Sequence, residues 1–246
     1  MISSDLLEAC QVDLTEGWGR DTLPVMTSVA QLFFLPGAGS FAPHVMLEEA
    51  GIAHELLRVV RDEQSVPVEP AGYLALNPSG RIPTIVWADG TVQTESAAIC
   101  LTLAEATGRD NLIPAIGQAE RAEVLARLVF LTNTVQIAIL RARYPDRFAD
   151  DDAGRESVAA RGNRDLLELR DRCAGWYANG KPFLRGEEPG VDDVFLGMLI
   201  RWTRLSLVPW WDNATLSDFY DRFHAWPSVA RAREQEQFEA RPPAGT

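Results

Sequence analysis

The sequence predicts two domains, an α/β domain over residues 30–107 and an all-helical domain over residues 117–246. Three observations support this fold class. Short runs rich in β-forming residues alternate with helical patterns up to about residue 107. The segment 108–116 gathers glycine, aspartate, asparagine and proline, as linkers often do. Beyond it, helical periodicity is the only regular pattern.

The first domain begins with a predicted strand at 31–35, which stops at a Pro-Gly pair. A helix at 41–51 follows, opened by Ser40 and Pro43. The N–H groups at the start of such a helix lack partners within it, so this turn suits an anion. Gly51 stands where a left-handed residue commonly ends a helix.

A second strand is predicted at 54–60, and an irregular segment with two prolines follows it. Asp89-Gly90 then separates two short β-rich runs, 84–87 and 91–94, and this pair predicts a hairpin. A helix starts at Glu95-Ser96 and runs to about residue 107. The predicted order of elements is therefore β-α-β-loop-β-β-α.

The second domain is predicted to consist of helices alone. At one helix start, Asp193 lies three residues after Gly190, which is a weakened form of a capping box. The helical periodicity covers five segments, at about 118–143, 153–178, 191–206, 215–224 and 228–239.

The charge balance limits the classes of partner. The 246 residues carry a formal net charge of −12, with 35 acidic against 23 basic side chains. This excess of acid disfavours non-specific binding to nucleic acid or to an anionic membrane surface. The longest apolar stretch, 124–140, is interrupted by Arg127, Asn133 and Gln136, so we expect a buried helix and no membrane span.

Cysteine and histidine usage predicts neither disulfides nor a metal. The three cysteines, Cys10, Cys100 and Cys173, are far apart, which favours a reducing compartment. The three histidines show no spacing typical of a metal site. Residues 1–29 read as an acidic, loosely ordered extension without signal-peptide features, and Met26 is an alternative start. We therefore expect a cytoplasmic protein.

Several motifs of the first domain occur in a fixed order. They are Leu35-Pro36-Gly37-Ala38, Ser40, Ala42-Pro43-His44, Glu49-Ala50-Gly51, Asn77-Pro78-Ser79-Gly80, Ile82-Pro83, Asp89-Gly90 and Thr94-Glu95-Ser96. Weaker echoes follow in Arg201-Trp202 and Trp226-Pro227-Ser228-Val229. With these motifs the chain resembles the cytosolic glutathione transferases, and most of all their bacterial beta class. The resemblance covers about residues 30–240.

The resemblance implies a thioredoxin-like first domain that binds glutathione. It implies a cis bond at Ile82-Pro83, with the Ile82 backbone turned toward the cysteinyl backbone of the tripeptide. Ser96 at a helix start suits the γ-glutamyl carboxylate, and Glu95 suits the ammonium group. Gln64 is the best positional match for the glycyl carboxylate, with Arg58 and Arg81 as alternatives.

The chain departs from the beta class at the residue that activates the thiol. Where that class has a cysteine, this sequence has Gly39, which argues against mixed-disulfide chemistry. Ser40 is the one hydroxyl at the helix start that can donate to a thiolate, and an ordinary helix cap is the alternative interpretation. A histidine expected on the long helix falls at Gln136.

The predicted function is conjugation of the glutathione thiolate to a small, mostly apolar electrophile, as in detoxification. The resemblance implies a cleft for this electrophile, which we expect Phe34, Phe41, Leu128, Thr132 and Gln136 to line. Ether cleavage and dehalogenation are variants with another electrophile. The rival from a different class is a non-catalytic binding or interaction protein. We expect glutathione as co-substrate, no metal, and a homodimer.

Overall fold

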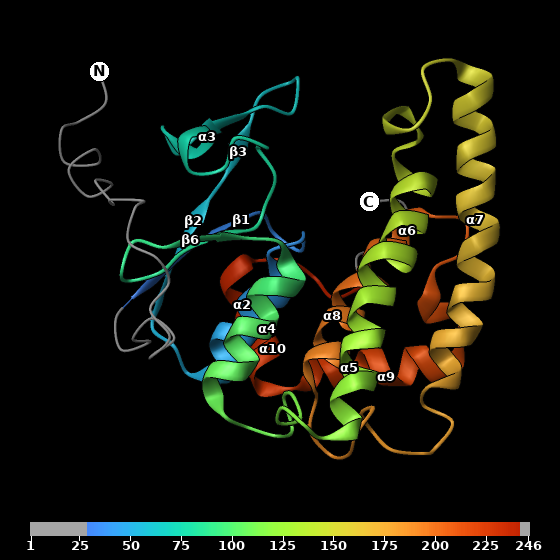
Figure 1. Cartoon of the computed structure of the whole chain (residues 1–246). Coiled ribbons are helices and arrows are strands. Elements are labelled where there is room, and N and C mark those ends of the chain that lie inside the picture. The colour runs from blue at the N-terminus through green and yellow to red at the C-terminus, as the bar shows by residue number, and fades with distance from the viewer. Residues whose placement is uncertain (1–28, 242–246) are drawn as a thin grey trace. The chain divides into compact units, whose positions relative to one another are not determined.

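The computed structural model describes residues 29–241, so the predicted extension, Cys10 and Met26 lie outside the described range. The chain divides into two compact units between Thr107 and Gly108 (Figure 1). The first unit holds a mixed sheet with helices, and the second holds helices. The predicted fold class is confirmed.

The first unit is built on a four-stranded sheet in the order β2-β1-β5-β6. β1 pairs in parallel with β2 and antiparallel with β5, and β5 pairs antiparallel with β6. This is the thioredoxin-like arrangement that the motifs implied. The strands are β1 (Ala30–Phe34), β2 (His54–Arg58), β5 (Thr84–Val86) and β6 (Val92–Thr94).

Helices α2 (Phe41–Ala50) and α4 (Ser96–Thr107) pack against each other on one face of this sheet, as Figure 1 shows. The first seven residues of α2, 41–47, are all buried, because its sequence is apolar nearly all the way round. Gly51 ends the helix as predicted: its φ is 66°, and its N–H donates to the Glu48 carbonyl at 3.3 Å.

The segment predicted to be irregular contains regular structure. It forms a two-stranded hairpin from β3 (Val60–Arg61) and β4 (Pro67–Glu69), followed by the short helix α3 (Tyr73–Leu76). The sequence pattern hid these elements because strands of two or three residues are too short to show a period. Pro67 stands at the start of its strand, where a missing N–H does little harm.

The second unit is helical, as predicted. Its α-helices are α5 (Ala119–Phe130), α6 (Gln136–Arg143), α7 (Asp152–Gly175), α8 (Val191–Trp202), α9 (Ala214–Ala225) and α10 (Pro227–Glu236). Short 3-10 turns occur at Pro145–Arg147, Thr203–Leu205 and Trp210–Asp212. The predicted continuous helix 118–143 is interrupted by a π-helical turn at Leu131–Val135, between α5 and α6.

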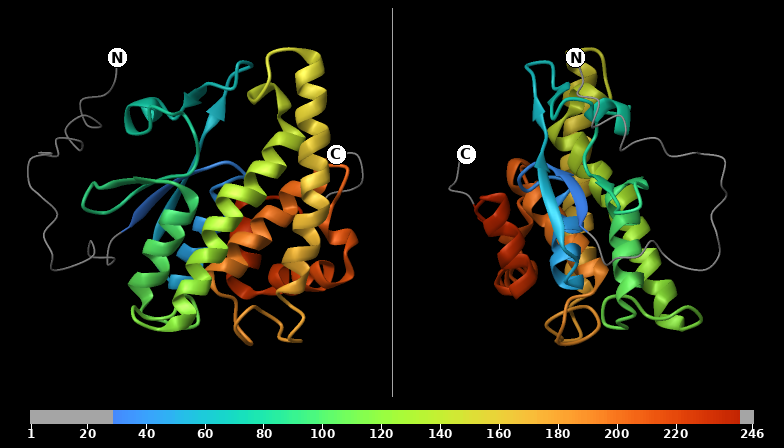
Figure 2. Two further views of the ribbon diagram at one scale, coloured as in Figure 1. Left: turned by 45° about the vertical axis from the view of Figure 1, so that its right-hand side comes forward. Right: turned by 90° about the vertical axis from the view of Figure 1, so that its left-hand side faces the viewer.

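Helices α6 and α7 run side by side, as the left-hand view of Figure 2 shows. Their backbones approach closely at Gly162, where a Cβ would lie 2.6 Å from the Ala142 nitrogen. Only glycine fits there without a shift of the backbone. Helix α8 is the centre of the unit, because its residues 191–201 are all buried.

The combined helix Ala119–Arg143 is long and apolar enough to cross a membrane, judged by length and composition alone. It is the one such helix among the described residues. Its α6 portion packs along α7, as a core helix of a folded domain does. Only 33% of the most apolar window of this helix is buried, so the predicted buried helix is found only in part.

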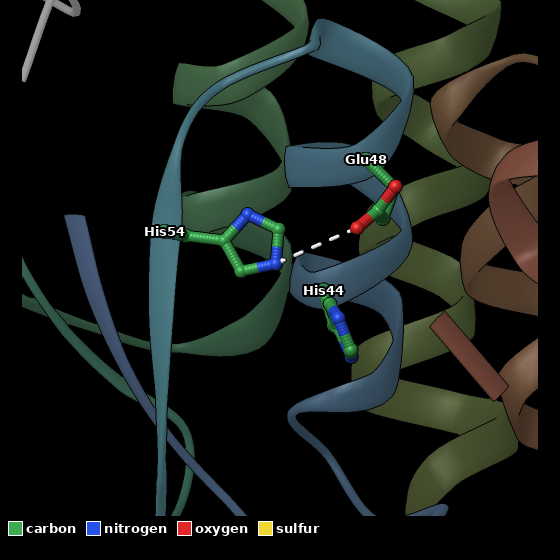
Figure 3. Close-up of side chains that lie close together, drawn as sticks. All are labelled: His44, Glu48 and His54. Atoms are coloured by element: carbon green, nitrogen blue, oxygen red, sulfur yellow. Dashed lines mark ion pairs between the residues drawn. The ribbon is translucent and has the colours of Figure 1, made fainter. Parts of the chain in front are cut away.

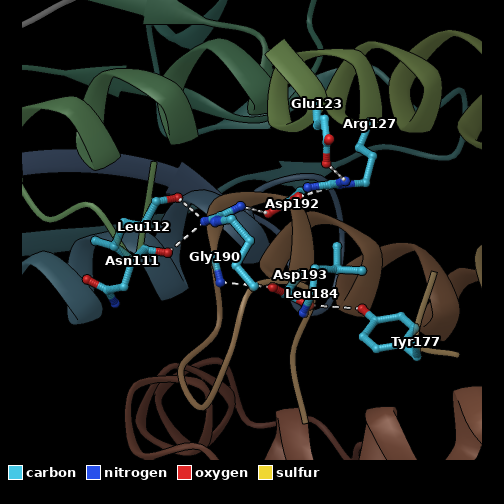
Figure 4. Close-up of polar contacts among 10 residues, drawn as sticks. Asn111, Leu112, Glu123, Arg127, Tyr177, Leu184, Gly190, Asp192 and Asp193 are labelled. Atoms are coloured by element: carbon cyan, nitrogen blue, oxygen red, sulfur yellow. Dashed lines mark hydrogen bonds and ion pairs between the residues drawn. The ribbon is translucent and has the colours of Figure 1, made fainter. Parts of the chain in front are cut away.

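A buried polar network holds the start of α8 (Figure 4). The Asp192 carboxylate is fully buried and accepts hydrogen bonds from Arg127 Nε at 2.7 Å and Arg185 Nη1 at 2.8 Å. Arg185 also donates to the carbonyls of Asn111 and Leu112 at 2.6 and 3.0 Å. Asp192 thereby joins α5, the loop before α8 and the segment that follows Thr107.

The neighbouring Asp193 closes the same helix start. Its carboxylate accepts hydrogen bonds from the Gly190 N–H at 2.9 Å, the Leu184 N–H at 3.1 Å and the Tyr177 hydroxyl at 2.9 Å. The bond from the Gly190 N–H to Asp193 is one of the two hydrogen bonds of a capping box, as the sequence predicted. The reciprocal bond is missing because glycine has no side chain to accept it. Burial and the adjacent Asp192 raise the pKa of Asp193 to about 7, although its three donors favour the charged form.

Candidate functional site

The turn between β1 and α2 is closed by Ser40. The Ser40 hydroxyl donates a hydrogen bond to the Leu35 carbonyl at 3.2 Å. In return, Ser40 Oγ accepts a hydrogen bond from the Leu35 N–H at 3.2 Å. Ser40 is fully buried and makes no side-chain cap hydrogen bond. Neither predicted role, thiolate donor or side-chain helix cap, matches this geometry. The hydroxyl fixes the shape of the turn.

The backbone of the same turn leaves donors available. Within residues 29–241, no hydrogen bond uses the N–H of Gly39 or of Ser40. Both groups stand at the start of α2, where the helix dipole favours negative charge. The anion-binding character predicted for this turn therefore rests on main-chain N–H groups.

The loop before β5 carries the second predicted element. The Ile82-Pro83 peptide bond is cis, as the resemblance implied. Ile82 is half-buried, and no hydrogen bond in the described part of the chain engages its N–H or its C=O. These two groups are therefore available to an extended peptide, in the way that an unpaired strand edge is.

Residues that were not predicted to belong to the site hold this loop in place through hydrogen bonds. The Asn77 amide donates to the Arg81 carbonyl at 2.8 Å and to Thr84 Oγ1 at 3.0 Å. The Tyr73 hydroxyl donates to the same Arg81 carbonyl and lies 2.9 Å from Thr84 Oγ1. Asn77, Tyr73 and Thr84 are buried, and they act as positioning residues for Ile82. Asn77 belongs to a quoted motif, whereas no sequence signal marked Tyr73.

The third element is the junction of β6 and α4. Glu95 has a φ of 70°, which is uncommon for a residue with a side chain and often marks a functional site. This conformation ends β6 and lets α4 begin at Ser96. Glu95 is exposed and Ser96 is half-buried. Gln93 ties the hairpin to α4 through a 2.9 Å hydrogen bond to Thr102.

These three elements meet at Gly39. The Ser96 hydroxyl donates to the Gly39 carbonyl at 2.8 Å. A Cβ built on Gly39 would lie 3.1 Å from the Ile82 oxygen, 3.2 Å from Ser96 Oγ and 3.5 Å from Pro83 Cδ. The structure thus brings Ile82, Pro83 and Ser96 together around the position where the beta class has its cysteine.

The candidates for the glycyl carboxylate lie apart from one another. Gln64 is exposed in the turn between β3 and β4, and no described hydrogen bond joins its side chain to the other predicted glutathione residues. Arg58 ends β2 in register with Phe34, at the sheet edge that leads into the α2 turn. Arg81 is exposed and directly precedes Ile82. All three residues therefore remain candidates for the glycyl carboxylate.

The residues predicted to line an electrophile cleft come from both units. Phe34, Phe41 and Leu128 are 7%, 1% and 2% exposed. Side chains so buried offer little surface to a ligand, which argues against them as walls of an open pocket. Thr132 lies in the π-helical turn and Gln136 begins α6, and both are half-buried.

Neither described cysteine is available as a nucleophile. Cys100 on α4 and Cys173 on α7 are both fully buried. Burial raises the pKa of the Cys100 thiol far above its usual range and that of Cys173 to about 12. Any activated thiol at this site must therefore come from the ligand, as far as the described residues are concerned.

A surface hollow in the first unit lies at the other end of the sheet from this site. The strand register places it beside the start of β1 and the turn of the β5–β6 hairpin. Its lining residues are Val29, Gln31, Glu55, Val86, Trp87, Ala88, Asp89 and Gly90.

Comparison with known proteins identifies the family. The model of the glutathione S-transferase N-terminal domain matches residues 40–106. The glutathione S-transferase stcT of Emericella nidulans is 31% identical over 160 residues, which cover 64% of this chain and 71% of the relative. The chain belongs to the glutathione S-transferase family. The matched N-terminal domain contains Ile82, Pro83, Glu95 and Ser96.

Solved structures of bacterial glutathione S-transferases share the fold of this family member. A beta class enzyme from Sphingomonas chungbukensis is 26% identical with a TM-score of 0.70, and the match covers 84% of this chain and 98% of that one. A sphingomonad glutathione S-transferase complexed with glutathione is 26% identical with a TM-score of 0.72, covering 85% and 100%. The resemblance to the beta class is confirmed.

Proposed function

We propose that this glutathione S-transferase family member binds glutathione in its first unit and transfers the sulfur to a small, mostly apolar electrophile. The convergence of Ile82, Pro83 and Ser96 around Gly39 is the observation that carries the proposal. A chain that had given up the tripeptide would have no chemical reason to keep this arrangement.

Each part of glutathione has a candidate partner. The unengaged N–H and C=O of Ile82 suit the cysteinyl backbone. The α4 start at Ser96 suits the γ-glutamyl carboxylate, and the exposed Glu95 suits the ammonium group. Gln64, Arg58 and Arg81 are all exposed and remain candidates for the glycyl carboxylate.

The thiolate would be stabilised by the backbone and not by the Ser40 hydroxyl. The N–H groups of Gly39 and Ser40 are the available donors, whereas the hydroxyl is engaged with Leu35. A helix start lowers the pKa of a thiol held against it, which raises the fraction of nucleophile at neutral pH. The thiolate then forms a bond to the electrophilic carbon, and the leaving group departs with its electron pair.

For the electrophile we propose contributions from Thr132 and Gln136, which are the half-buried members of the predicted set. The π-helical turn at Leu131–Val135 supports this choice, because such turns occur frequently at functional sites. We further propose a cytoplasmic homodimer with a role in detoxification, in line with the resemblance to the family.

The test is an ultraviolet pH titration of the full chain with saturating glutathione. We expect thiolate absorbance to appear well below the free thiol pKa of about 8.5. Glu95→Gln should weaken glutathione binding at least about tenfold, because it removes a charge-assisted hydrogen bond. Glu105→Gln, at an exposed position further along α4, should bind like the wild type.

Ser40→Ala in the same titration separates the two sources of thiol activation. An unchanged thiolate signal would support stabilisation by the backbone N–H groups. Loss of the signal in a folded variant would show that the Ser40 hydroxyl stabilises the thiolate. Glutathione that binds with an unshifted thiol would contradict the transferase proposal and favour the non-catalytic alternative. No binding at all would contradict the glutathione site itself.

A further inference from the structure

Two histidines that lie ten residues apart in the sequence come together beside one glutamate (Figure 3). His44 and Glu48 stand one turn apart on α2, and His54 is the first residue of β2. The turn through Gly51 brings β2 back along α2, so the three side chains converge. One ligand atom from each lies within 4.8 Å of the other two.

The hydrogen bonding of His54 fixes which ring nitrogen faces the cluster. His54 Nδ1 lies 2.8 Å from the Ile52 carbonyl oxygen. A carbonyl only accepts, so Nδ1 carries a proton and donates it. The other nitrogen, Nε2, lies 3.7 Å from Glu48 Oε1. A neutral ring would then direct a lone pair at a carboxylate oxygen, and only a positive charge between the two atoms makes this arrangement favourable.

A metal ion would supply that charge at a point where His44 offers a third ligand atom. A proton on Nε2 would satisfy His54 and Glu48 alone. His44 also faces the cluster, with its ring 5.2 Å from that of His54 and inclined at 77°. In a tetrahedral zinc site with bonds of about 2.0–2.1 Å, neighbouring ligand atoms lie about 3.3 Å apart. The 3.7 Å separation of His54 Nε2 and Glu48 Oε1 is close to this value. The three ligand atoms lie within 4.8 Å of one another, so binding of an ion would draw them closer together.

The environment suits a bound ion as well. His44 is fully buried, and the side chains of His54 and Glu48 are 9% and 12% exposed. The hydrogen bond from His54 Nδ1 to Ile52 is the kind of contact that orients metal-binding histidines and sets their tautomer. Two imidazoles and a carboxylate favour zinc and its neighbours over magnesium or calcium, which prefer oxygen ligands.

We propose that His44, Glu48 and His54 bind one divalent transition metal ion, with Zn²⁺ as the best match and water at the fourth position. The ion links α2 to β2 across the Gly51 turn and stabilises the first unit. The site is separate from the proposed glutathione site, and its chemistry does not depend on that proposal. Histidine spacing predicted no metal because the convergence arises from the helix-to-strand turn.

The experiment measures metal binding to the full, metal-stripped chain. Titration calorimetry with Zn²⁺ should give one tight site per chain, and Co²⁺ should give the visible absorption bands of tetrahedral cobalt. Bound Zn²⁺ should also raise the melting temperature, because it binds the folded state. Mutation of a residue that only hydrogen-bonds to a metal ligand typically lowers metal affinity by about 10–100-fold, and loss of a ligand itself should cost at least as much. His54→Gln and Glu48→Gln should therefore each weaken binding at least about tenfold.

Glu49→Gln is the matched control, because it removes the same charge one residue along the same helix. His224→Gln controls for the loss of a histidine elsewhere in the chain. Both variants should keep the site. Equal binding by Glu48→Gln and Glu49→Gln would overturn the proposal, since the ion would then sit elsewhere. Absence of binding would overturn it too, and would leave His54 and Glu48 as an ordinary ion pair.

Discussion

Gly39 stands at the position where the beta class has a cysteine. Its backbone conformation does not require glycine, because its φ is not among the positive values in the described chain. A Cβ added at this position would lie 3.1 Å from the Ile82 oxygen and 3.2 Å from Ser96 Oγ, so these neighbours would have to shift by a few tenths of an ångström. The structure therefore places Ile82, Pro83 and Ser96 around a position that carries no side chain.

Gly39→Cys should create a thiol that reacts with oxidised glutathione. The new thiolate would attack the disulfide, form a mixed disulfide and release one glutathione thiolate. The start of α2 should favour this by lowering the thiol pKa. Intact mass spectrometry should show one glutathionyl group more than the wild type and more than Gly39→Ala. The same adduct count in all three proteins would contradict the position assigned to residue 39.

The sequence predicted the site residues unevenly, and the reason is physical. The cis bond at Ile82-Pro83 and the start of α4 at Ser96 were predictable, because the family resemblance implied the first and the residue pattern indicated the second. The hydroxyl of Ser40 was not, because its direction depends on a rotamer that the turn selects. The His44, Glu48 and His54 cluster was missed because its members meet only after the chain reverses.

Helix α8 begins with two adjacent buried acids, Asp192 and Asp193, and each makes a different set of contacts. Asp192 balances the charges of Arg127 and Arg185, and Asp193 accepts hydrogen bonds from main-chain and tyrosine donors. Buried donors that lose their acceptor destabilise a fold by about 1–3 kcal/mol each.

Asp193→Ala should lower the free energy of unfolding by about 3 kcal/mol, because it leaves three buried donors without an acceptor. Urea unfolding followed by circular dichroism measures this loss. Asp218→Ala, at an exposed position on α9, is the control and should change stability by less than about 0.5 kcal/mol. Similar losses in the two variants would mean that the Asp193 contacts contribute little.

The long helix of the second unit shows what periodicity misses at the element scale. The pattern predicted one continuous helix over 118–143, and the backbone path agrees with it. A π-helical turn at Leu131–Val135 inserts an extra residue into that path. The extra residue rotates the side chains after the turn, including Gln136, about the helix axis relative to those before it. No residue type in the sequence indicates the presence of this turn.

At the scale of the molecule, the order of element types was enough to predict both units. Strand and hairpin signals located the sheet, and helical spacing located the bundle. The short hairpin β3–β4 and helix α3 were missed because their elements are shorter than any detectable period. Tyr73, at the start of α3, then proved to support the site.

Stability of the whole molecule should fall on mild acidification because of His224. Burial and the positive charges of Arg233, Arg201 and Arg241 lower the pKa of His224 to about 3. An unfolded histidine has a pKa of about 6.5, so below that pH the unfolded chain binds a proton that the folded chain refuses. The contribution of His224 to the free energy of unfolding is therefore fully present above about pH 6.5 and decreases as the pH falls toward 3.

His224→Gln should remove this part of the pH dependence. Between about pH 7 and pH 5 the wild type should lose about 2 kcal/mol through this one group. Denaturant unfolding of both proteins at the two pH values provides the comparison. Equal losses in the variant and the wild type would show that His224 takes up its proton as readily when folded as when unfolded.

The hydrogen bond from Ser96 to Gly39 has a consequence for how a ligand enters. A hydroxyl has a single proton to donate, and the Ser96 hydroxyl donates it to the Gly39 carbonyl just before α2. A carboxylate that needs the same proton competes with the protein's own backbone. An acid bound by the Ser96 hydroxyl would therefore take this donor away from the Gly39 carbonyl, which would couple binding at the start of α4 to the turn before α2.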